Sequence, residues 1–441
     1  MMKHRISAFL LAALLAVTAA GCSAQEPEDS AGLPESSAGT AVRSEAFYPA
    51  EAGYTDYDGS LVQGWSGWNA DGTFTFQNHN TLTTLSRENQ VLETITLPEE
   101  ALPDSEYSLD RSDEYILTLS NPASTNEPSG VVYYTDSGTV CLANLTLFDR
   151  QGNLVRQYPR SQVYGYDEND QKICLLPCPE GETVTDTYEL SANTLHWLDG
   201  HTAIFDCHSF IIFYDFAADS GQVLDDMNEI AAQFGRFSTY CGSQMGGVVD
   251  GTYYYLTRRG TDPISGYTLW AADADGAREL LDGQRFWHLF AAKDGLVLVD
   301  DINPADPESD SRVWYLPTGS TQPTLIWGGD LSLYITEADQ IAFISWAWSL
   351  DNSVLYSYDP VTGTLSSRDL EECIQINSLF TLVRDGSLRY YYSQYKDGER
   401  TSWVYDTATD TTTPLTRFDG GLYVSWLSPD GQYWAEQDPS T

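Results

Sequence analysis

The chain has 441 residues, of which 64 are acidic and 22 are basic, giving a formal charge of −42 at pH 7. A surface this acidic repels nucleic acid and anionic lipid, which excludes both as binding partners. Hydrophobic residues make up 42% of the chain and aromatic residues 13%, enough for a large core and typical of half-buried strands.

Residues 1–21 have the three parts of a secretory signal. Lys3 and Arg5 form a short positive segment, an apolar stretch covers residues 6–17, and small residues precede Cys22. The apolar stretch is too short to cross a hydrocarbon layer of roughly 30 Å as a helix. We therefore interpret it as a cleaved signal rather than as a membrane anchor.

The segment Ala19-Ala20-Gly21-Cys22 resembles the lipobox of bacterial lipoproteins, which usually have Leu where this chain has Ala19. The resemblance implies that Cys22 carries the lipid and that the mature protein is anchored to the bacterial cell membrane, facing outside the cytoplasm. An ordinary signal peptide followed by a chance Cys is the alternative. The rest of residues 22–45 is rich in Ser, Ala, Glu, Pro and Gly, which predicts a flexible tether.

A strand–turn–strand pattern repeats through residues 46–441. One hairpin has Asp-Gly or a related turn, and its copies centre on Gly72, Asp113, Gly200, Gly251, Gly295, Asp339, Gly386 and Gly431. A second, aromatic-rich hairpin follows most of these copies, with turns at Gly152, Gly221, Gly276, Gly319, Gly363 and Asp410. In the second half of the chain both hairpins recur every 43–47 residues.

Four strands in each such repeat is the size of one β-propeller blade. We therefore predict an all-β fold over residues 46–441: a propeller of four-stranded antiparallel blades, with eight blades favoured and seven as the alternative. A protein of two β domains is a third alternative. Residues 46–60 are expected to complete the blade of the C-terminal hairpin at 422–436, and residues 225–236 have the spacing of one inserted helix.

Two short motifs resemble a known class of propellers. The segment LSPDGQYWAE at 427–436 and the turn YDPVTGT at 358–364 are similar to the repeats of TolB-type, WD-like propellers of bacterial envelopes. The resemblance implies a fold and no particular activity, because propellers have many unrelated functions.

A set of tryptophans near the ends of predicted inner strands is the first candidate site. If they face one mouth of the central channel, they form an aromatic platform for a sugar or peptide; packing between blades is the alternative. The set consists of Trp65, Trp68, Trp346, Trp348 and Trp426.

An acidic loop is the second candidate site. Asp300, Asp301, Asp306 and Asp310 offer hard oxygen ligands that suit Ca²⁺, although their spacing differs from that of an EF-hand. A plain polar loop between two strands is the alternative, and no other cofactor is expected. Six cysteines follow Cys22, an even number that permits disulfides without fixing their pairing.

The sequence contains none of the short motifs that carry a catalytic mechanism, such as HExxH, a P-loop or GxSxG, and no catalytic residue can be singled out. The favoured function is a membrane-anchored binding or scaffold module for a protein or glycan at the cell envelope. A propeller enzyme that hydrolyses or cleaves glycans is the alternative. A solute-binding lipoprotein of a transporter is a third reading, which predicts two α/β lobes with long helices.

Overall fold

The structure, a computed structural model, is described here for the following residues. They are 41–46, 54–58, 66–68, 73–86, 90–102, 107–120, 129–190, 194–228, 242–258, 267–281, 286–292, 294–300, 311–329, 341–345, 353–370, 376–384, 387–396, 399–406, 409–414, 426–427 and 433–437. Residues 39–441 form one compact unit, separate from residues 1–38, and all the described residues belong to it.

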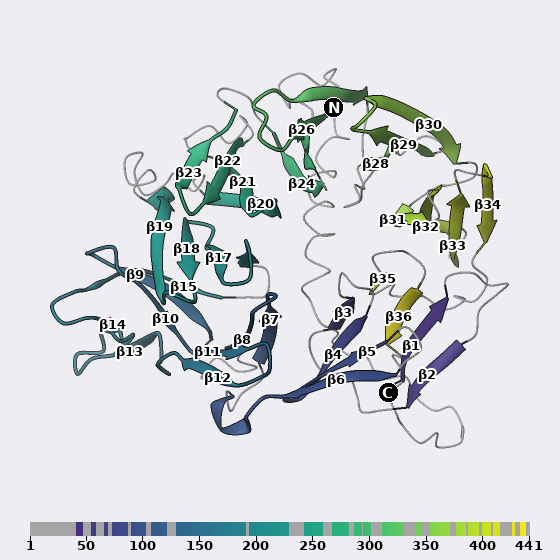
Figure 1. The fold of residues 1–441 in the computed structure, drawn as a ribbon. Helices are drawn as coiled ribbons and strands as arrows, with labels where there is room; N and C mark the ends of the chain where they lie inside the picture. The colour runs from purple at the N-terminus through teal and green to yellow at the C-terminus, as the bar shows by residue number, and fades with distance from the viewer. Residues whose placement is uncertain are drawn as a thin grey trace, which may run out of the picture. The chain divides into compact units, whose positions relative to one another are not determined.

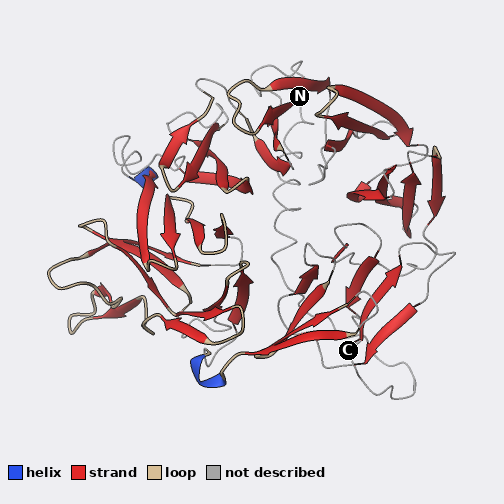
Figure 2. Ribbon diagram, in the orientation of Figure 1, coloured by secondary structure: helices blue, strands red, loops and turns tan. Residues whose placement is uncertain are grey.

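This unit is built almost entirely of strands, paired in antiparallel sheets that are mostly four-stranded (Figures 1 and 2). The first such sheet is β3-β4-β5-β6, formed by β3 (Ser66–Trp68), β4 (Phe74–Asn78), β5 (Thr81–Leu85) and β6 (Val91–Thr96). A single 3-10 turn, Glu99–Ala101, follows it. The predicted all-β propeller fold of four-stranded antiparallel blades is confirmed, while the number of blades stays a prediction.

Four later sheets repeat the same order of neighbouring strands. They contain β16 (Leu195–Trp197), β17 (Thr202–Asp206), β18 (Phe210–Asp215) and β19 (Ser220–Asp226); β20 (Gly242–Val249), β21 (Thr252–Arg258), β22 (Thr268–Asp273) and β23 (Gly276–Glu279); β24 (His288–Ala292), β25 (Gly295–Asp300), β26 (Ser311–Pro317) and β27 (Thr324–Gly329); and β31 (Ile376–Arg384), β32 (Ser387–Lys396), β33 (Glu399–Asp406) and β34 (Thr411–Pro414). Between the last two, β28 (Ile341–Ser345), β29 (Ser353–Asp359) and β30 (Thr364–Leu370) form a three-stranded sheet.

The two ends of the unit share one sheet, of order β2-β1-β36-β35. It combines β1 (Ala41–Ala46) and β2 (Tyr54–Asp58) with β35 (Trp426–Leu427) and β36 (Tyr433–Gln437). Purple β1 and yellow β36 lie side by side in Figure 1, with Ser44 opposite Ala435. The expected pairing of the chain ends is therefore present. However, β1 begins at Ala41, inside the range 22–45 that we expected to be tether, because its backbone pairs with β36.

One sheet departs from the regular pattern. In the sheet β12-β11-β8-β7, the connection between β8 (Tyr115–Ser120) and β11 (Leu145–Asp149) is a long extension rather than a tight turn; β7 (Tyr107–Arg111) and β12 (Leu154–Gln157) complete this sheet. The extension contains β9 (Val131–Thr135) and β10 (Val140–Ala143), which pair with each other. Strand β15 (Val184–Glu189) adds to the free side of β9. We call β10-β9-β15 the accessory sheet.

A small hairpin lies in the chain between β12 and β15, the last strand of the accessory sheet. It consists of β13 (Tyr164–Tyr166) and β14 (Lys172–Cys174), which pair only with each other among the described strands. We call residues 164–174 the hairpin arm, which is visible at the outer edge of the drawing in Figure 1.

Buried apolar side chains fill the spaces between sheets. The largest cluster joins three of them: Leu117 and Leu147 come from β8 and β11, Tyr134 from the accessory sheet, and Phe205 and Phe210 from β17 and β18. Such continuous burial explains why these strands read as apolar and aromatic runs.

The helix expected over residues 225–236 is only partly covered by the described residues. Strand β19 continues to Asp226, and a helical conformation begins at Met227 and Asn228. Met227 is fully buried, so its apolar character reflects packing against the neighbouring sheet. The two α/β lobes that the solute-binding alternative predicts are absent from the described residues, and no helix among these residues is long and apolar enough to cross a membrane.

Candidate functional site

The predicted tryptophan platform lies largely outside the described residues. Trp68 ends β3 and Trp426 begins β35, and nothing is described of their side chains. Trp65, Trp346 and Trp348 lie outside the described residues. The platform therefore stays a prediction.

Most of the predicted acidic loop also lies outside the described residues. Asp300 ends β25, and its carboxylate accepts a charged hydrogen bond from Arg312 on the neighbouring strand β26. Asp301, Asp306 and Asp310, like Cys22, lie outside the described residues. No group of three or more His, Cys, Asp or Glu side chains within the described part of the chain is arranged to hold a metal ion.

The accessory sheet is joined to the rest of the molecule at Asn144, which stands between β10 and β11. Its backbone has φ +60°, a conformation that Asn tolerates better than most residues. The side-chain amide donates to the carbonyls of Ser129 (2.8 Å) and Ser161 (2.9 Å), and its oxygen accepts from the Ser161 amide (2.8 Å). One buried side chain thus ties the start of β9 to the segment that leads into the hairpin arm.

The hairpin arm carries a surface that sequence reasoning missed. Tyr166 is 73% exposed, Tyr164 43%, and Ile173 and Leu175 about as much as Tyr164. The register pairs Tyr166 with Lys172, so both tyrosines and Lys172 share one face of the hairpin. The Lys172 ammonium lies 3.6 Å from the centre of the Tyr164 ring, a cation–π contact. The arm therefore offers aromatic faces that already accept a cation.

Carboxylates in the turn of the arm and at the accessory sheet have lowered pKa values and keep their charge. Asp167 in its turn accepts amide hydrogens from Gln171 and Asn169, which lower its pKa. At the accessory sheet, the amide and hydroxyl of Thr183 lower the pKa of Asp136, and hydroxyl donors including Thr135 lower that of Glu182. The surface thus combines exposed aromatic rings with fixed negative charge.

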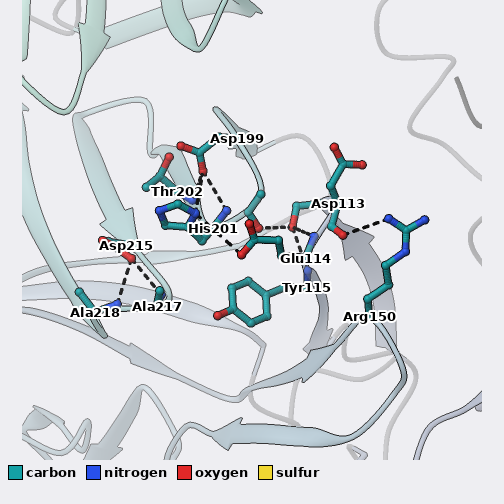
Figure 3. Close-up of polar contacts among 12 residues, drawn as sticks. Asp113, Glu114, Tyr115, Arg150, Asp199, His201, Thr202, Asp215, Ala217 and Ala218 are labelled. Atoms are coloured by element: carbon teal, nitrogen blue, oxygen red, sulfur yellow. Dashed lines mark hydrogen bonds and ion pairs between the residues drawn. The ribbon is translucent and has the colours of Figure 1, made fainter.

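A second polar cluster joins two inner hairpin turns of neighbouring sheets, the β7–β8 turn and the β16–β17 turn (Figure 3). The His201 Nδ1 atom lies 3.5 Å from Asp199 Oδ1 and 3.9 Å from Glu114 Oε2. The Ser112 hydroxyl donates to the Gly200 carbonyl at 2.5 Å and accepts from the Tyr115 amide at 3.0 Å. The Ser112 hydroxyl therefore makes its hydrogen bonds with backbone groups and does not pair with His201 as an activated nucleophile would.

Asp110 lies next to this cluster on β7. Burial raises its pKa to about 6, although the Arg111 amide and the Trp197 indole both donate to its carboxylate. A raised carboxyl pKa is common in catalytic sites, but structural pairs produce it as well. Here the indole donor belongs to β16 of the neighbouring sheet, so Asp110 and Trp197 fasten two sheets together.

Buried tyrosine–aspartate pairs make similar contacts elsewhere. The hydroxyl of Tyr134 donates to Asp226 at 2.6 Å, that of Tyr253 to Asp206 at 2.5 Å and that of Tyr255 to Asp225 at 2.7 Å. Each pair links the β16–β19 sheet to an adjacent one. These aspartates satisfy buried hydroxyls, so their role is structural.

Solved structures show the fold that this chain shares. It is similar to dipeptidyl peptidase 4 of Porphyromonas gingivalis, with 13% sequence identity and a TM-score of 0.51, over 85% of this chain and 56% of that one. The propeller domain of the Trilobed protease of Pyrococcus furiosus matches with 12% identity and a TM-score of 0.38, over 73% of this chain and 85% of that one. A putative TolB of Agrobacterium tumefaciens matches with 12% identity and a TM-score of 0.32, over 58% of this chain and 94% of that one.

No protein-family model matches the chain, and no curated protein matches it by sequence. The chain spans little more than half the length of the peptidase, and the identity is low, so this likeness concerns the fold alone. The propeller architecture that the TolB-type motifs implied is supported. The chain is therefore a β-propeller by fold, with an accessory sheet and a hairpin arm built onto it.

Proposed function

We propose that this protein is a lipid-anchored binding module outside the cytoplasm, and that its hairpin arm holds a basic protein partner. The observation that carries the proposal is the exposed pair Tyr164 and Tyr166 on a hairpin whose turn contains the charged Asp167. Large exposed aromatic side chains on a projecting element are typical of protein-binding surfaces, because they bury much apolar area with little loss of conformational freedom.

Charge decides which class of partner suits the arm. The chain has a formal charge of −42, and the lowered pKa values of Asp167 in the arm and Glu182 at the accessory sheet mean that both carboxylates are ionised at neutral pH. A partner with Lys or Arg side chains gains both long-range attraction and cation–π contact, as Lys172 does with Tyr164. Such a complex weakens as salt rises, since the screening length falls to about 10 Å at 0.1 M.

The lipobox at Cys22 supports placement at the membrane. Replacing Cys22 by Ala removes the only thiol that the signal offers for lipidation, so the variant should leave the membrane fraction. Fractionation of cells followed by immunoblotting measures this. A Cys22→Ala protein that stays with membranes as the unaltered protein does would overturn the anchor.

The partner can be sought by site-specific photo-crosslinking in the native cell. A photoreactive amino acid replaces Tyr166 in one strain and Val361 in a control strain. Val361 is 89% exposed on a different sheet, so it reports contacts made by exposure alone. We expect a discrete crosslinked band at position 166 only, containing a protein of basic pI, and reduced when the cells are irradiated at high salt.

Three results would overturn the proposed partner class. They are equal crosslinking at both positions, crosslinking at position 166 to a glycan, and no product at position 166. A Tyr166→Ala variant then tests the contact directly. Affinity purification of this variant should recover at least tenfold less of the partner identified by crosslinking, while Val361→Ala should leave the recovery unchanged.

A further inference from the structure

Three cysteines gather around the accessory sheet and the hairpin arm. Cys141 lies in β10, Cys174 ends β14, and Cys178 follows four residues later. All three are free thiols, as is the buried Cys207 on another sheet. The proposed function uses none of them.

Tyr133 brings Cys141 and Cys178 together. Cys141 lies directly opposite Tyr133 in the β9–β10 ladder, so both side chains leave the same face of the sheet. The Tyr133 hydroxyl donates to the carbonyl of Pro177 at 2.6 Å, and Pro177 is bonded to Cys178. Both Cys141 and Cys178 interact electrostatically with the Tyr133 hydroxyl, so the two cysteines lie near the same phenol group.

Apolar packing holds this arrangement. Val131, Tyr133 and Ala143 on one face of the accessory sheet form a buried cluster with Val163 and Leu176, and Cys141 packs against it. Leu176 is two residues from Cys178, so the cluster presses the segment after the arm onto the sheet. Burial raises the pKa of the Cys141 thiol, and negative charge on Cys178 raises it further. The two thiols are therefore close enough to interact.

We propose that Cys141 and Cys178 form a disulfide bond that fastens the base of the hairpin arm to the accessory sheet. The oxidant is a small or protein disulfide. One protein thiolate attacks it to give a mixed disulfide and release one thiol, and the second protein thiolate then displaces the other thiol. Two protein thiols and one disulfide thus become one protein disulfide and two thiols.

Cys174 is the competing partner, because it is only four residues from Cys178 in the chain. Burial raises the pKa of the Cys178 thiol, and the charges of Glu182, Asp136 and Cys174 raise it further. Cys174 is exposed, however, and lies opposite Tyr164 on the two-stranded arm, whereas Cys141 packs against the buried cluster. The pairing with Cys141 also closes a loop of roughly 37 residues, which restricts the unfolded chain far more than a local bridge does.

The test uses the full chain, purified and equilibrated with mixtures of reduced and oxidised glutathione. Free thiols are then blocked with maleimide and the protein is digested without reduction for mass spectrometry. We expect one linked peptide pair containing residues 141 and 178. Cys174→Ser and Cys207→Ser should retain this link, whereas Cys141→Ser and Cys178→Ser should abolish it.

Thermal melting gives a second readout. Reduction should lower the Tm of the unaltered protein, of Cys174→Ser and of Cys207→Ser by several degrees, and leave Cys141→Ser and Cys178→Ser unchanged. A link between residues 174 and 178, a link to Cys241 or Cys373, or full maleimide labelling under oxidising conditions would overturn the proposal. None of these results depends on the partner of the arm, so the two proposals fail separately.

Discussion

At the scale of single residues, Asp110 illustrates how sheet packing changes acid–base behaviour. Its pKa is about 6 in the folded protein because it is buried, against an ordinary value of 3.8. Between these values the folded chain binds more protons than the unfolded chain, so the free energy of unfolding falls as pH rises. Above pH 6 the Asp110 carboxylate is ionised in the folded protein, which then bears the full free-energy cost of burying that charge.

We therefore expect Asp110→Asn to stabilise the protein at pH 7.5 by up to about 3 kcal/mol, since one pKa unit corresponds to about 1.4 kcal/mol. The gain should shrink as the pH falls from 6 toward 4 and vanish below the ordinary pKa of 3.8, where the carboxyl group becomes neutral in both states. Melting curves at pH 4.5, 6 and 7.5 measure the effect. The exposed Asp275→Asn serves as the control, and an equal response of both variants would contradict the prediction.

Asn144 is the other residue whose role can be tested alone. Asn144→Asp keeps the size and the acceptor for the Ser161 amide but loses both donors, and it turns a carboxylate toward the carbonyls of Ser129 and Ser161. We expect a loss of about 3 kcal/mol in the free energy of unfolding, because a buried group left unpaired costs roughly 1–3 kcal/mol. Chemical denaturation measures this loss. A loss below about 1 kcal/mol would show that the Asn144 amide does not hold the start of β9 to the segment that leads into the hairpin arm.

At the scale of elements, the strand ends explain part of the acidic composition. An Asp closes many of the strands that enter a turn, and its carboxylate accepts the amide hydrogen two residues on. Asp215 accepts from Ala217 (2.9 Å) and Ala218 (3.0 Å), as Figure 3 shows, and Asp359 accepts from Val361 (2.9 Å). These aspartates replace missing backbone partners in the turn, so their charge follows from the hairpin repeat itself.

Strand β20 depends on a glycine for a different reason. A Cβ atom on Gly246 would lie 1.7 Å from the Tyr253 hydroxyl oxygen, and the Tyr253 ring is fully buried. Gly246→Ala should therefore destabilise the protein by about 3 kcal/mol or more, because the ring has no room to move. In a matched substitution, Gly247→Ala, the added Cβ lies 3.0 Å from Ala291 Cβ and at ordinary contact distance from the Ala291 backbone, so it should cost less. Equal Tm values for the two variants would contradict this account.

At the scale of the whole molecule, the sheet shared by the chain ends has the largest consequence. Deleting residues 422–441 removes β35 and β36 and leaves β1 paired only with β2, with its other edge exposed. Exposed strand edges are prone to intermolecular pairing, so we expect a sharply lower Tm and aggregation on heating. Deleting residues 1–38, which precede β1, is the control and should leave the Tm unchanged. Calorimetry and light scattering follow both variants.

The hairpin repeat was predictable because its signals are local. Gly152 and Gly363 have φ values of +83° and +68°, the backbone conformation that the expected turns require, and alternating aromatic residues mark the strands beside them. The pairing of the two chain ends also follows from counting strands. The accessory sheet was not predicted, because β9 and β10 look like any other pair of strands and only their pairing with β15 shows that they leave the regular sheet.

By itself the sequence determined the class of fold, the repeat, and the signal and lipobox features that lead us to propose a membrane anchor. These depend on short-range patterns: turn residues, alternation and an apolar run. Only the tertiary structure decided which side chains meet. Asp110 and Trp197 are far apart in the chain, as are Tyr134 and Asp226. Cys141 is likewise distant in the chain from Cys174 and Cys178, although all three interact with Tyr133. The exposure of Tyr166 was likewise undetermined, since a tyrosine on a strand reads the same whether it packs between sheets or faces water.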